Sequence, residues 1–348
     1  MKKMSSFWCI FGMLLILMMG CTLQEPKEHV QEPQKEEQIQ IGMCFDTFVL
    51  ERWLRDRDVF VSTANDLGAQ VNVQDANGDS AEQCKQVKYL IEKKVDAIVI
   101  VPVDTGSEKL KDLLQDAKAV GIIVVSYDRL VQNANMDLYV SFDNVKVGTL
   151  MAEAVLSQIP ENGKIAAIYG PDTDDNVAKV VSGIEEVLND HNQKLVYENK
   201  ARGWVEEYGF EYTNDCLSQV GFVDAIICGN DALAAAAIKA LAENQLAGKV
   251  CIVGQDADIQ ACQRIVEGYQ YMTVYKPIQN LAKLAAQYTV QLIQGEVIDM
   301  DEKMNDGTYD VPFGKLEPTA VTKGNIDEVI IASQFHFREE VYLHVDEK

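Results

Sequence analysis

From residue 38 onward, short apolar runs alternate with longer segments in which apolar side chains recur every three or four positions. The short runs are rich in valine and isoleucine and have the length of strands, whereas the longer segments have the period of helices. The first five strand-like runs are IQIGMCF, AQVNVQD, DAIVIVPV, GIIVVSYD and LYVSFD. The predicted helices between the first four runs are 51–67, 80–94 and 105–119. Continuous apolar strands separated by helices predict a parallel sheet that is covered on both faces.

The same alternation starts again at residue 164. The second set of strand-like runs is KIAAIYG, QKLVYENKA, DAIICGN, KVCIVGQD and MTVYKP. The predicted helices of this half are 176–190, 205–219, 231–245 and 258–267, and a long helix at 278–294 follows the last strand. Two successive α/β units of similar length predict two Rossmann-like lobes.

Polar side chains follow six of these strands, two in the first half and four in the second, at the points where the strands end. They are Asp46, Asp128-Arg129, Asp174-Asp175-Asn176, Asn230-Asp231, Gln255-Asp256 and Lys276. An aspartate or asparagine at such a turn often caps the next helix, which would explain any one of these positions by itself. Arginine and lysine cannot cap a helix N-terminus, however, and ligands of such sheets bind beyond the C-terminal strand ends. Together, the six positions predict one binding cleft between the lobes.

The first twenty residues have the pattern of a secretory signal. Lys2 and Lys3 precede an uncharged apolar run from Phe7 to Met19, which is too short to span a membrane as a helix. The segment LMMGC then resembles the lipobox of bacterial lipoproteins, so we expect lipidation at Cys21. Simple secretion or an uncleaved anchor are the alternatives. Residues 21–39 are rich in Glu, Gln, Lys and Pro and predict a flexible tether outside the cytoplasm.

Composition narrows the classes of function. The formal net charge of −23 argues against nucleic acid and against docking of the folded part on anionic lipid. Of eight cysteines, Cys44, Cys228 and Cys251 lie in apolar runs, which favours free buried thiols. With four histidines and no cysteine ladder, we expect no metal site. The sequence has no GxGxxG after a strand and no P-loop, and its histidines suit no catalytic triad. We therefore expect no cofactor and no catalysis.

Several stretches together resemble the D-xylose-binding proteins of bacterial ABC transporters, within the ribose/galactose class of periplasmic binding proteins. The matching stretches are LERWLRDRDVF, QDANGD, SYDRL, YVSFDNVKVG, TDDNVAK, GNDALAAAAI, GQDAD and MTVYKPI, in the order of that family. The chain departs from the family at Asp174-Asp175-Asn176, where the family has Asp-Asn-Asn. It also departs at Thr47 and Val49, which replace an acid and a base.

The resemblance implies a set of sugar-binding residues from both lobes. They are Arg52, Trp53, Asp128 and Arg129 from the first lobe, Asp174, Asn176, Trp204, Asn230 and Asp256 from the second, and Lys276 near the hinge. Carboxylates, amides and guanidinium groups suit hydroxyls that both donate and accept hydrogen bonds. The mature chain has two tryptophans, Trp53 and Trp204, whose rings could pack on the C–H face of a sugar. Core packing is the other interpretation of each ring.

The resemblance also implies a hinge of three crossings between the lobes, near Asp143-Asn144, Lys276-Pro277 and Asp310–Pro312. The N-terminal lobe would then comprise 40–143 and 278–310. The C-terminal lobe would comprise 144–277 and 311–340, with a strand around 312–322. Closure of the lobes on a bound monosaccharide would follow, because the ligand contacts both of them.

Two kinds of receptor remain open at this point. One is a transport receptor on the outer face of the cytoplasmic membrane, which delivers D-xylose or a related aldopentose or aldohexose to an ABC permease. The other is a sensory receptor on the same fold that docks on a membrane histidine kinase or chemoreceptor. A sugar-processing enzyme would need an acid and base pair that no motif supports. A repressor is excluded, because a signal segment stands where a DNA-binding domain should be.

Overall fold

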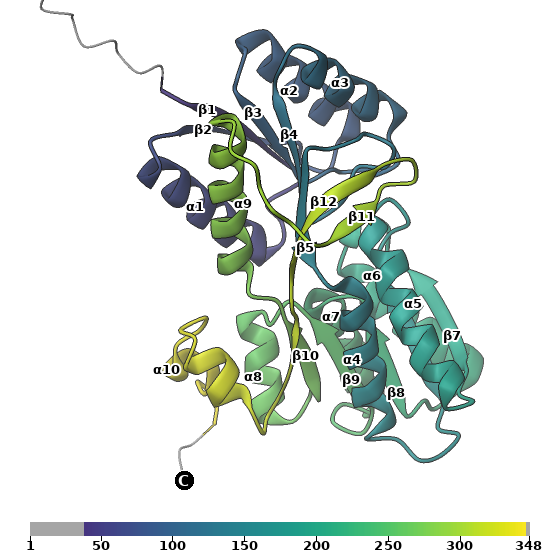
Figure 1. Cartoon of the computed structure of the whole chain (residues 1–348). Helices are drawn as coiled ribbons and strands as arrows, with labels where there is room; N and C mark the ends of the chain where they lie inside the picture. The colour runs from purple at the N-terminus through teal and green to yellow at the C-terminus, as the bar shows by residue number, and fades with distance from the viewer. Residues whose placement is uncertain (1–37, 346–348) are drawn as a thin grey trace, which may run out of the picture. The chain divides into compact units, whose positions relative to one another are not determined.

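Two β-sheets flanked by helices carry the part of the chain that the computed structural model describes, residues 38–345 (Figure 1). The first sheet has seven strands in the order β11-β12-β5-β4-β3-β1-β2. Its strands are β1 (Gln40–Phe45), β2 (Gln70–Asp75), β3 (Ala97–Ile100), β4 (Ile123–Tyr127), β5 (Leu138–Phe142), β11 (Lys303–Asn305) and β12 (Asp310–Leu316). Neighbouring strands pair parallel except β11, which runs antiparallel to β12 at the edge.

The second sheet has six strands in the order β13-β10-β9-β8-β6-β7. Its strands are β6 (Ile165–Tyr169), β7 (Leu195–Lys200), β8 (Ala225–Cys228), β9 (Cys251–Gln255), β10 (Met272–Tyr275) and β13 (Thr319–Thr322). Here β13 is the antiparallel edge strand, paired with β10. Every residue of β6 and β8 is buried, as expected for strands with helices on both faces. The predicted α/β fold of two Rossmann-like lobes is confirmed.

The helices divide between the two sheets. Those of the first lobe are α1 (Glu51–Asp66), α2 (Ser80–Lys93), α3 (Glu108–Ala119) and α9 (Ile278–Ile293). Those of the second lobe are α4 (Asn144–Leu156), α5 (Asp175–Asp190), α6 (Glu207–Val220), α7 (Asp231–Glu243) and α8 (Ile259–Glu267). A 3₁₀ turn (Arg202–Trp204), a π-helical turn (Asp327–Ile331) and the short α10 (Arg338–Val341) complete the described elements.

Helix α4 was not among the predicted helices. The helix has the sequence NVKVGTLMAEAVL and is apolar around most of its surface. This composition suits a helix that packs on both α5 and the second sheet. The contact with α5 is unusually close. A Cβ atom added at Gly148 would lie 2.0 Å from the carbonyl oxygen of Val180, and one at Gly183 would lie 2.0 Å from that of Val145. Glycine at both positions therefore lets the two helix backbones touch.

The chain passes between the sheets three times. The first two passages, from β5 to α4 and from β10 to α9, lie at Asp143-Asn144 and Lys276-Pro277. The third does not lie at Asp310–Pro312, and the strand expected around 312–322 is two strands. β12 joins the first sheet beside β5, β13 joins the second beside β10, and the chain crosses at Glu317-Pro318. Pro312 has no N–H to donate to a neighbouring strand. β12 still pairs at this point, because the N–H of the next residue, Phe313, donates to the carbonyl oxygen of Glu302 beside β11.

Candidate functional site

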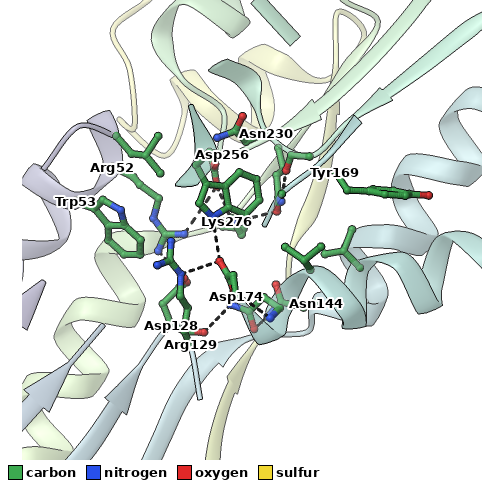
Figure 2. Close-up of a pocket in the computed structure, with 18 residues that line it drawn as sticks. Arg52, Trp53, Asp128, Arg129, Asn144, Tyr169, Asp174, Asn230, Asp256 and Lys276 are labelled. Atoms are coloured by element: carbon green, nitrogen blue, oxygen red, sulfur yellow. Dashed lines mark hydrogen bonds and ion pairs between the residues drawn. The ribbon is translucent and has the colours of Figure 1, made fainter. Parts of the chain in front are cut away.

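One cavity, of about 520 Å³ including its open side, is lined by side chains from both lobes (Figure 2). The structure brings together all ten residues that the sequence assigned to a ligand. They are Arg52, Trp53, Asp128, Arg129, Asp174, Asn176, Trp204, Asn230, Asp256 and Lys276. Most stand just beyond the C-terminal end of a strand, and Arg52 and Trp53 stand in the first turn of α1. The cavity therefore occupies the position at which open α/β sheets bind ligands.

Arg52 and Arg129 form the wall on the side of the first lobe. The guanidinium carbon of Arg52 lies 4.2 Å from the ring centroid of Trp53, and that of Arg129 lies 5.6 Å from the same ring. Trp53 is 1% exposed and its indole Nε1 has no protein partner, so its ring both packs in the core and lines the cavity. The two interpretations of Trp53 thus describe one arrangement.

Asp174 and Asn230 combine capping with exposure to the cavity. One carboxylate oxygen of Asp174 accepts the N–H of Asn176 and caps α5 at 3.0 Å. Its other oxygen accepts the indole N–H of Trp204 at 3.2 Å and lies 2.7 Å from Nε of Arg129. Asn230 caps α7 by accepting the N–H of Leu233 at 2.9 Å. Capping and binding are therefore not alternatives at these positions, because each side chain has a second polar atom to offer.

Two glycines make room for Trp204. A Cβ atom at Gly170, which follows β6, would lie 2.3 Å from the Trp204 ring, and one at Gly229, which follows β8, would lie 3.2 Å from it. Trp204 itself has a φ of 59°, next to Gly203 with a φ of 61°. A left-handed tryptophan is rare and is maintained only when its surroundings hold it. The second lobe therefore holds this indole at the cavity wall.

Ion pairs cross from one lobe to the other through the cavity. Arg129 joins Asp46 of the first lobe, at 2.5 Å, to Asp174 of the second. Arg52 lies 3.0 Å from Asp128 of the first lobe and 3.8 Å from Asp256 of the second. Figure 2 shows Arg52, Asp128, Arg129, Asp174 and Asp256 converging on one space. The structure is therefore that of closed lobes.

The cation Lys276 stands at the second passage between the lobes. Its ammonium group lies 2.6 Å from Asp256 and donates to Gln255 at 3.1 Å. Because β10 ends at Tyr275, one residue earlier, Lys276 lies in the hinge and its charge reaches the cavity from there.

Burial and pairing act in opposite directions on the charged groups. Burial alone would raise the pKa of Asp128, but Arg52, Lys276 and Arg129 outweigh it and hold that pKa below its usual value. Burial would likewise lower the pKa of Arg52, and Asp128, Asp56 and Asp256 instead raise it. Behind Arg52, burial raises the pKa of Asp56 to about 6, although Arg52 and the Tyr127 hydroxyl favour its charge. Asp128 and Arg52 thus stay charged across the physiological range.

The sequence analysis left out several cavity residues. They are Leu50, Asn144, Tyr169, Gly170, Val177, Val180 and Gly229. Gln255, one of the polar residues at the six strand ends, also lines the cavity, although the resemblance did not assign it to the sugar. Asn144 follows the strand-like run LYVSFD, so the rule that found the other polar residues could have included it. Val177 and Val180 give no such signal, because an apolar residue on α5 looks the same whether it faces the core or a ligand. Asp46 lies behind the cavity, where it holds Arg129.

Other predicted features have plain outcomes within residues 38–345. Among the described cysteines, Cys44, Cys84, Cys216 and Cys228 are free and buried, and Cys251 is free and partly buried. No described group of His, Cys, Asp and Glu side chains is arranged for a metal ion. No helix in the described range is long and apolar enough to cross a membrane. The predicted signal segment 1–20, Cys21 and all but the last residues of the tether lie outside the described residues.

A family model described as a periplasmic binding protein domain matches residues 41–297. The chain belongs to the periplasmic binding protein family. The D-xylose-binding periplasmic protein of Haemophilus influenzae is 41% identical to it over 309 residues, which cover 87% of this chain and 92% of the relative. The protein of the same name from Escherichia coli K12 is 38% identical over 337 residues, covering 95% and 99%. These relatives confirm the family that the sequence motifs indicated.

Solved periplasmic binding proteins share the fold. A carbohydrate-transporter solute-binding protein from Chloroflexus aurantiacus in complex with D-glucose has a TM-score of 0.79 and 25% identity, covering 86% of this chain and 98% of that one. An ABC-transporter solute-binding protein from Clostridium phytofermentans with bound β-D-glucose has a TM-score of 0.78 and 23% identity, covering 87% and 99%. The two-lobed architecture of this periplasmic binding protein is thus the architecture of known solute receptors.

Proposed function

We propose that this protein is an extracytoplasmic receptor that binds D-xylose between its lobes and delivers it to an ABC permease. The observation that carries the proposal is the interlobe cavity. Carboxylates, amides and guanidinium groups of both lobes meet there beside two indole rings. In this proposal the ten predicted residues contact the sugar, and the sugar leaves chemically unchanged.

The balance of charge in the cavity favours a neutral ligand. Its three cations, Arg52, Arg129 and Lys276, are each already paired with at least one protein carboxylate. A phosphate or carboxylate ligand would have to displace those partners, which are buried and costly to leave unpaired. Sugar hydroxyls can bond to both members of a pair at once, since each hydroxyl donates and accepts. Charge-assisted bonds of this kind contribute about 1.5–3 kcal/mol each.

The names of the relatives support a pentose. Two proteins that align with most of this chain are named D-xylose-binding, and both exceed 35% identity. The Chloroflexus protein was solved with D-glucose, which keeps a hexose as the alternative ligand to test. The transport role is favoured over the sensory one, because the solved neighbours named above are transporter components.

We further propose attachment to the outer face of the cytoplasmic membrane through a lipid on Cys21. The basis is the apolar run that ends in LMMGC and the polar segment after it. Radiolabelled palmitate should be incorporated into the wild-type protein and not into Cys21→Ser. Cys9→Ser is the control, because Cys9 lies within the predicted signal segment. Equal labelling of the Cys21→Ser and wild-type proteins would contradict the anchor.

Calorimetric titration of the purified protein tests the receptor and its ligand. We expect saturable binding of D-xylose that is tighter than binding of L-arabinose, D-ribose or D-glucose, and no binding of D-ribose 5-phosphate. Arg129→Ala and Asp256→Ala should abolish binding, because each leaves a buried charge without its partner across the lobes. Lys85→Ala, which removes an exposed ion pair with Glu82, is the control. No heat with any of the four sugars would overturn the proposal.

A further inference from the structure

Outside the cavity, α1 reaches the C-terminal segment of the chain through Arg55. Its Nη1 donates to the carbonyl oxygen of Phe335 at 2.6 Å, and its Nη2 donates to Nδ1 of His336 at 3.3 Å. Its guanidinium carbon also lies 4.6 Å from the ring centroid of Phe335. Neither Arg55 nor His336 lines the ligand cavity. This contact is therefore a second junction between parts of the molecule that the cavity also joins.

The C-terminal segment belongs to the second lobe. α10 packs on α8, and the two lie next to each other in Figure 1. Gln263 of α8 donates to the carbonyl oxygen of Glu340 at 2.8 Å, and Lys323 donates to that of Val266 at 2.6 Å. The segment should therefore move with the second lobe, whereas Arg55 moves with α1 and the first lobe.

The hydrogen bonds fix the state of His336. An arginine can only donate, so Nδ1 of His336 must accept, and the carbonyl oxygen of Ala257 can only accept, so Nε2 must carry the proton. The Nε2 to Ala257 oxygen distance is 2.8 Å, and the ring is 3% exposed. His336 is thus a neutral side chain that donates to the backbone carbonyl of Ala257 from outside the cavity.

That carbonyl follows directly after a cavity carboxylate. Asp256 and Ala257 both have positive φ, 103° and 55°, in a region that such residues seldom adopt. Such a conformation is maintained when surrounding bonds over-determine it. Ala257 is held at both ends, because its N–H donates to Thr273 Oγ1 at 3.1 Å and its carbonyl accepts from His336. His336 therefore bears on where the Asp256 carboxylate points.

We propose that Arg55 and His336 form a clasp between the closed lobes, in which His336 is a positioning residue for Asp256 and the clasp retains the bound sugar. The contacts of the clasp and of the cavity form one closed circuit of residues, which comprises Asp256, Arg52, Arg55, His336 and Ala257. Asp256 contacts Arg52 across the lobes, and Arg55 lies one helical turn after Arg52 on α1. From Arg55 the circuit returns through His336 and Ala257 to Asp256. Opening of the lobes separates Arg55 from His336 and releases both contacts together.

The clasp acts on release of the sugar more than on its capture. It forms after the lobes close, so removing it leaves the encounter with the sugar unchanged and makes reopening easier. This inference rests on the proposed function for its sugar readout. Stopped-flow tryptophan fluorescence with D-xylose should show dissociation on the order of tenfold faster in Arg55→Gln and His336→Gln, with the association rate constant little changed.

Two matched controls come from the same elements. Arg57 lies on α1 and pairs with the exposed Asp58, and His344 is an exposed histidine of the C-terminal segment. Arg57→Gln and His344→Gln should dissociate at the wild-type rate. The clasp is overturned if Arg55→Gln and His336→Gln release D-xylose no faster than these controls. It is also overturned if their association rate constants fall in proportion to their affinities.

Hydrogen exchange without sugar provides a separate readout. In His336→Gln the amides of Asp256 to Asp258 should exchange faster than in His344→Gln, because the Ala257 carbonyl has lost its partner. Exchange in the core strand β8 should match in the two variants, which distinguishes a local effect from general destabilisation. Should wild type fail to bind D-xylose, the proposed function fails while this comparison still decides the positioning role. Equal exchange at Asp256 to Asp258 would overturn that role.

Discussion

Three of the cavity side chains stand on backbone conformations that most residues avoid. Asp128, Trp204 and Asp256 have φ angles of 64°, 59° and 103°. Each such residue costs about 1–3 kcal/mol unless its neighbours hold it. At Asp128 the hold is visible, because its carbonyl oxygen accepts from Ser141 at 2.6 Å and from Asn176 at 2.8 Å. The backbone strain at these residues, which line the cavity, is thus offset by the hydrogen bonds behind them.

The first prediction at this scale concerns the space that Gly170 leaves for Trp204. In Gly170→Ala the new methyl group would lie 2.3 Å from the indole, so the ring must move away from its place in the cavity wall. We expect the affinity for D-xylose to fall on the order of tenfold, which calorimetry would measure. Gly106→Ala is the control, since the nearest atom to its new carbon is 3.6 Å away. Unchanged affinity in Gly170→Ala would mean that Trp204 does not contact the sugar.

A second prediction concerns pH and the buried ring of His336. Burial lowers the pKa of His336 from 6.5 to about 4, with Arg55 on α1 adding to this and the Ala257 carbonyl and Glu340 on α10 opposing it. Because the folded pKa lies below the unfolded one, the ring contributes stability that is complete above pH 6.5 and is lost as pH falls toward 4. Between pH 7.5 and 4.5, the wild type should therefore lose about 2 kcal/mol more unfolding free energy than His336→Gln. Urea titrations at the two pH values would measure this, and parallel losses in both proteins would contradict it.

At the scale of elements, the features that depend on a local sequence pattern were predictable. Those that depend on which other element a segment packs against or pairs with were not. The ends of the predicted helices lie close to the observed ones because apolar period and capping residues such as Asp79 and Ser107 are local signals. Helix α4 was not predicted because it packs on two sides, so its sequence lacks the contrast between an apolar and a polar face that marks other helices. The strand after Asp310 was misplaced because partner choice, β5 or β10, is not encoded in the strand itself.

The same reasoning applies to the candidate site. Polar residues beyond strand ends were predictable, since the fold places all those ends at one edge. The circuit through Arg55 and His336 was not, because their spacing in sequence says nothing of their contact. His336 gives no such signal in the sequence, because its burial is decided entirely by how the last segment packs.

The prediction at this scale concerns the contact between α4 and α5. Alanine normally stabilises a helix by up to about 1 kcal/mol relative to glycine. In Gly148→Ala and Gly183→Ala, however, the obstacle is a backbone carbonyl at 2.0 Å, which cannot rotate away. Overpacking therefore outweighs propensity, and we expect each change to destabilise the protein by about 2–3 kcal/mol in urea unfolding. Gly106→Ala should stay within about 0.5 kcal/mol of the wild type, and a stabilising Gly148→Ala would refute the close approach.

At the scale of the whole molecule, two groups of contacts distinguish closed from open lobes. One is the set of ion pairs through the cavity, and the other is the clasp of Arg55 and His336. Both form between lobes that three chain passages connect. A ligand shifts such an equilibrium by the extra contacts that it makes in the closed form. In the absence of ligand, these contacts between the lobes must therefore be too weak to keep the lobes closed permanently.

Small-angle X-ray scattering checks this directly. Adding D-xylose to the wild type should decrease the radius of gyration, because hinge rotation brings the lobes together. Asp256→Ala should show no decrease, since it removes the second-lobe partner of Arg52 and Lys276. Lys85→Ala should behave as the wild type. A radius of gyration that stays constant in the wild type at saturating sugar would contradict closure by hinge rotation.

The placement of β12 in the first sheet has a consequence for biosynthesis. Synthesis proceeds from the N-terminus, so most of the second lobe has been made before helix α9 and strand β12 of the first lobe emerge. Until then, β5 lacks the neighbour that covers its edge, and the apolar face that receives α9 stays open. The N-terminal lobe, although made first, thus completes its fold late. A nascent chain stopped before residue 310 should expose this unfinished sheet to proteases, whereas one extended past Leu316 should resist them.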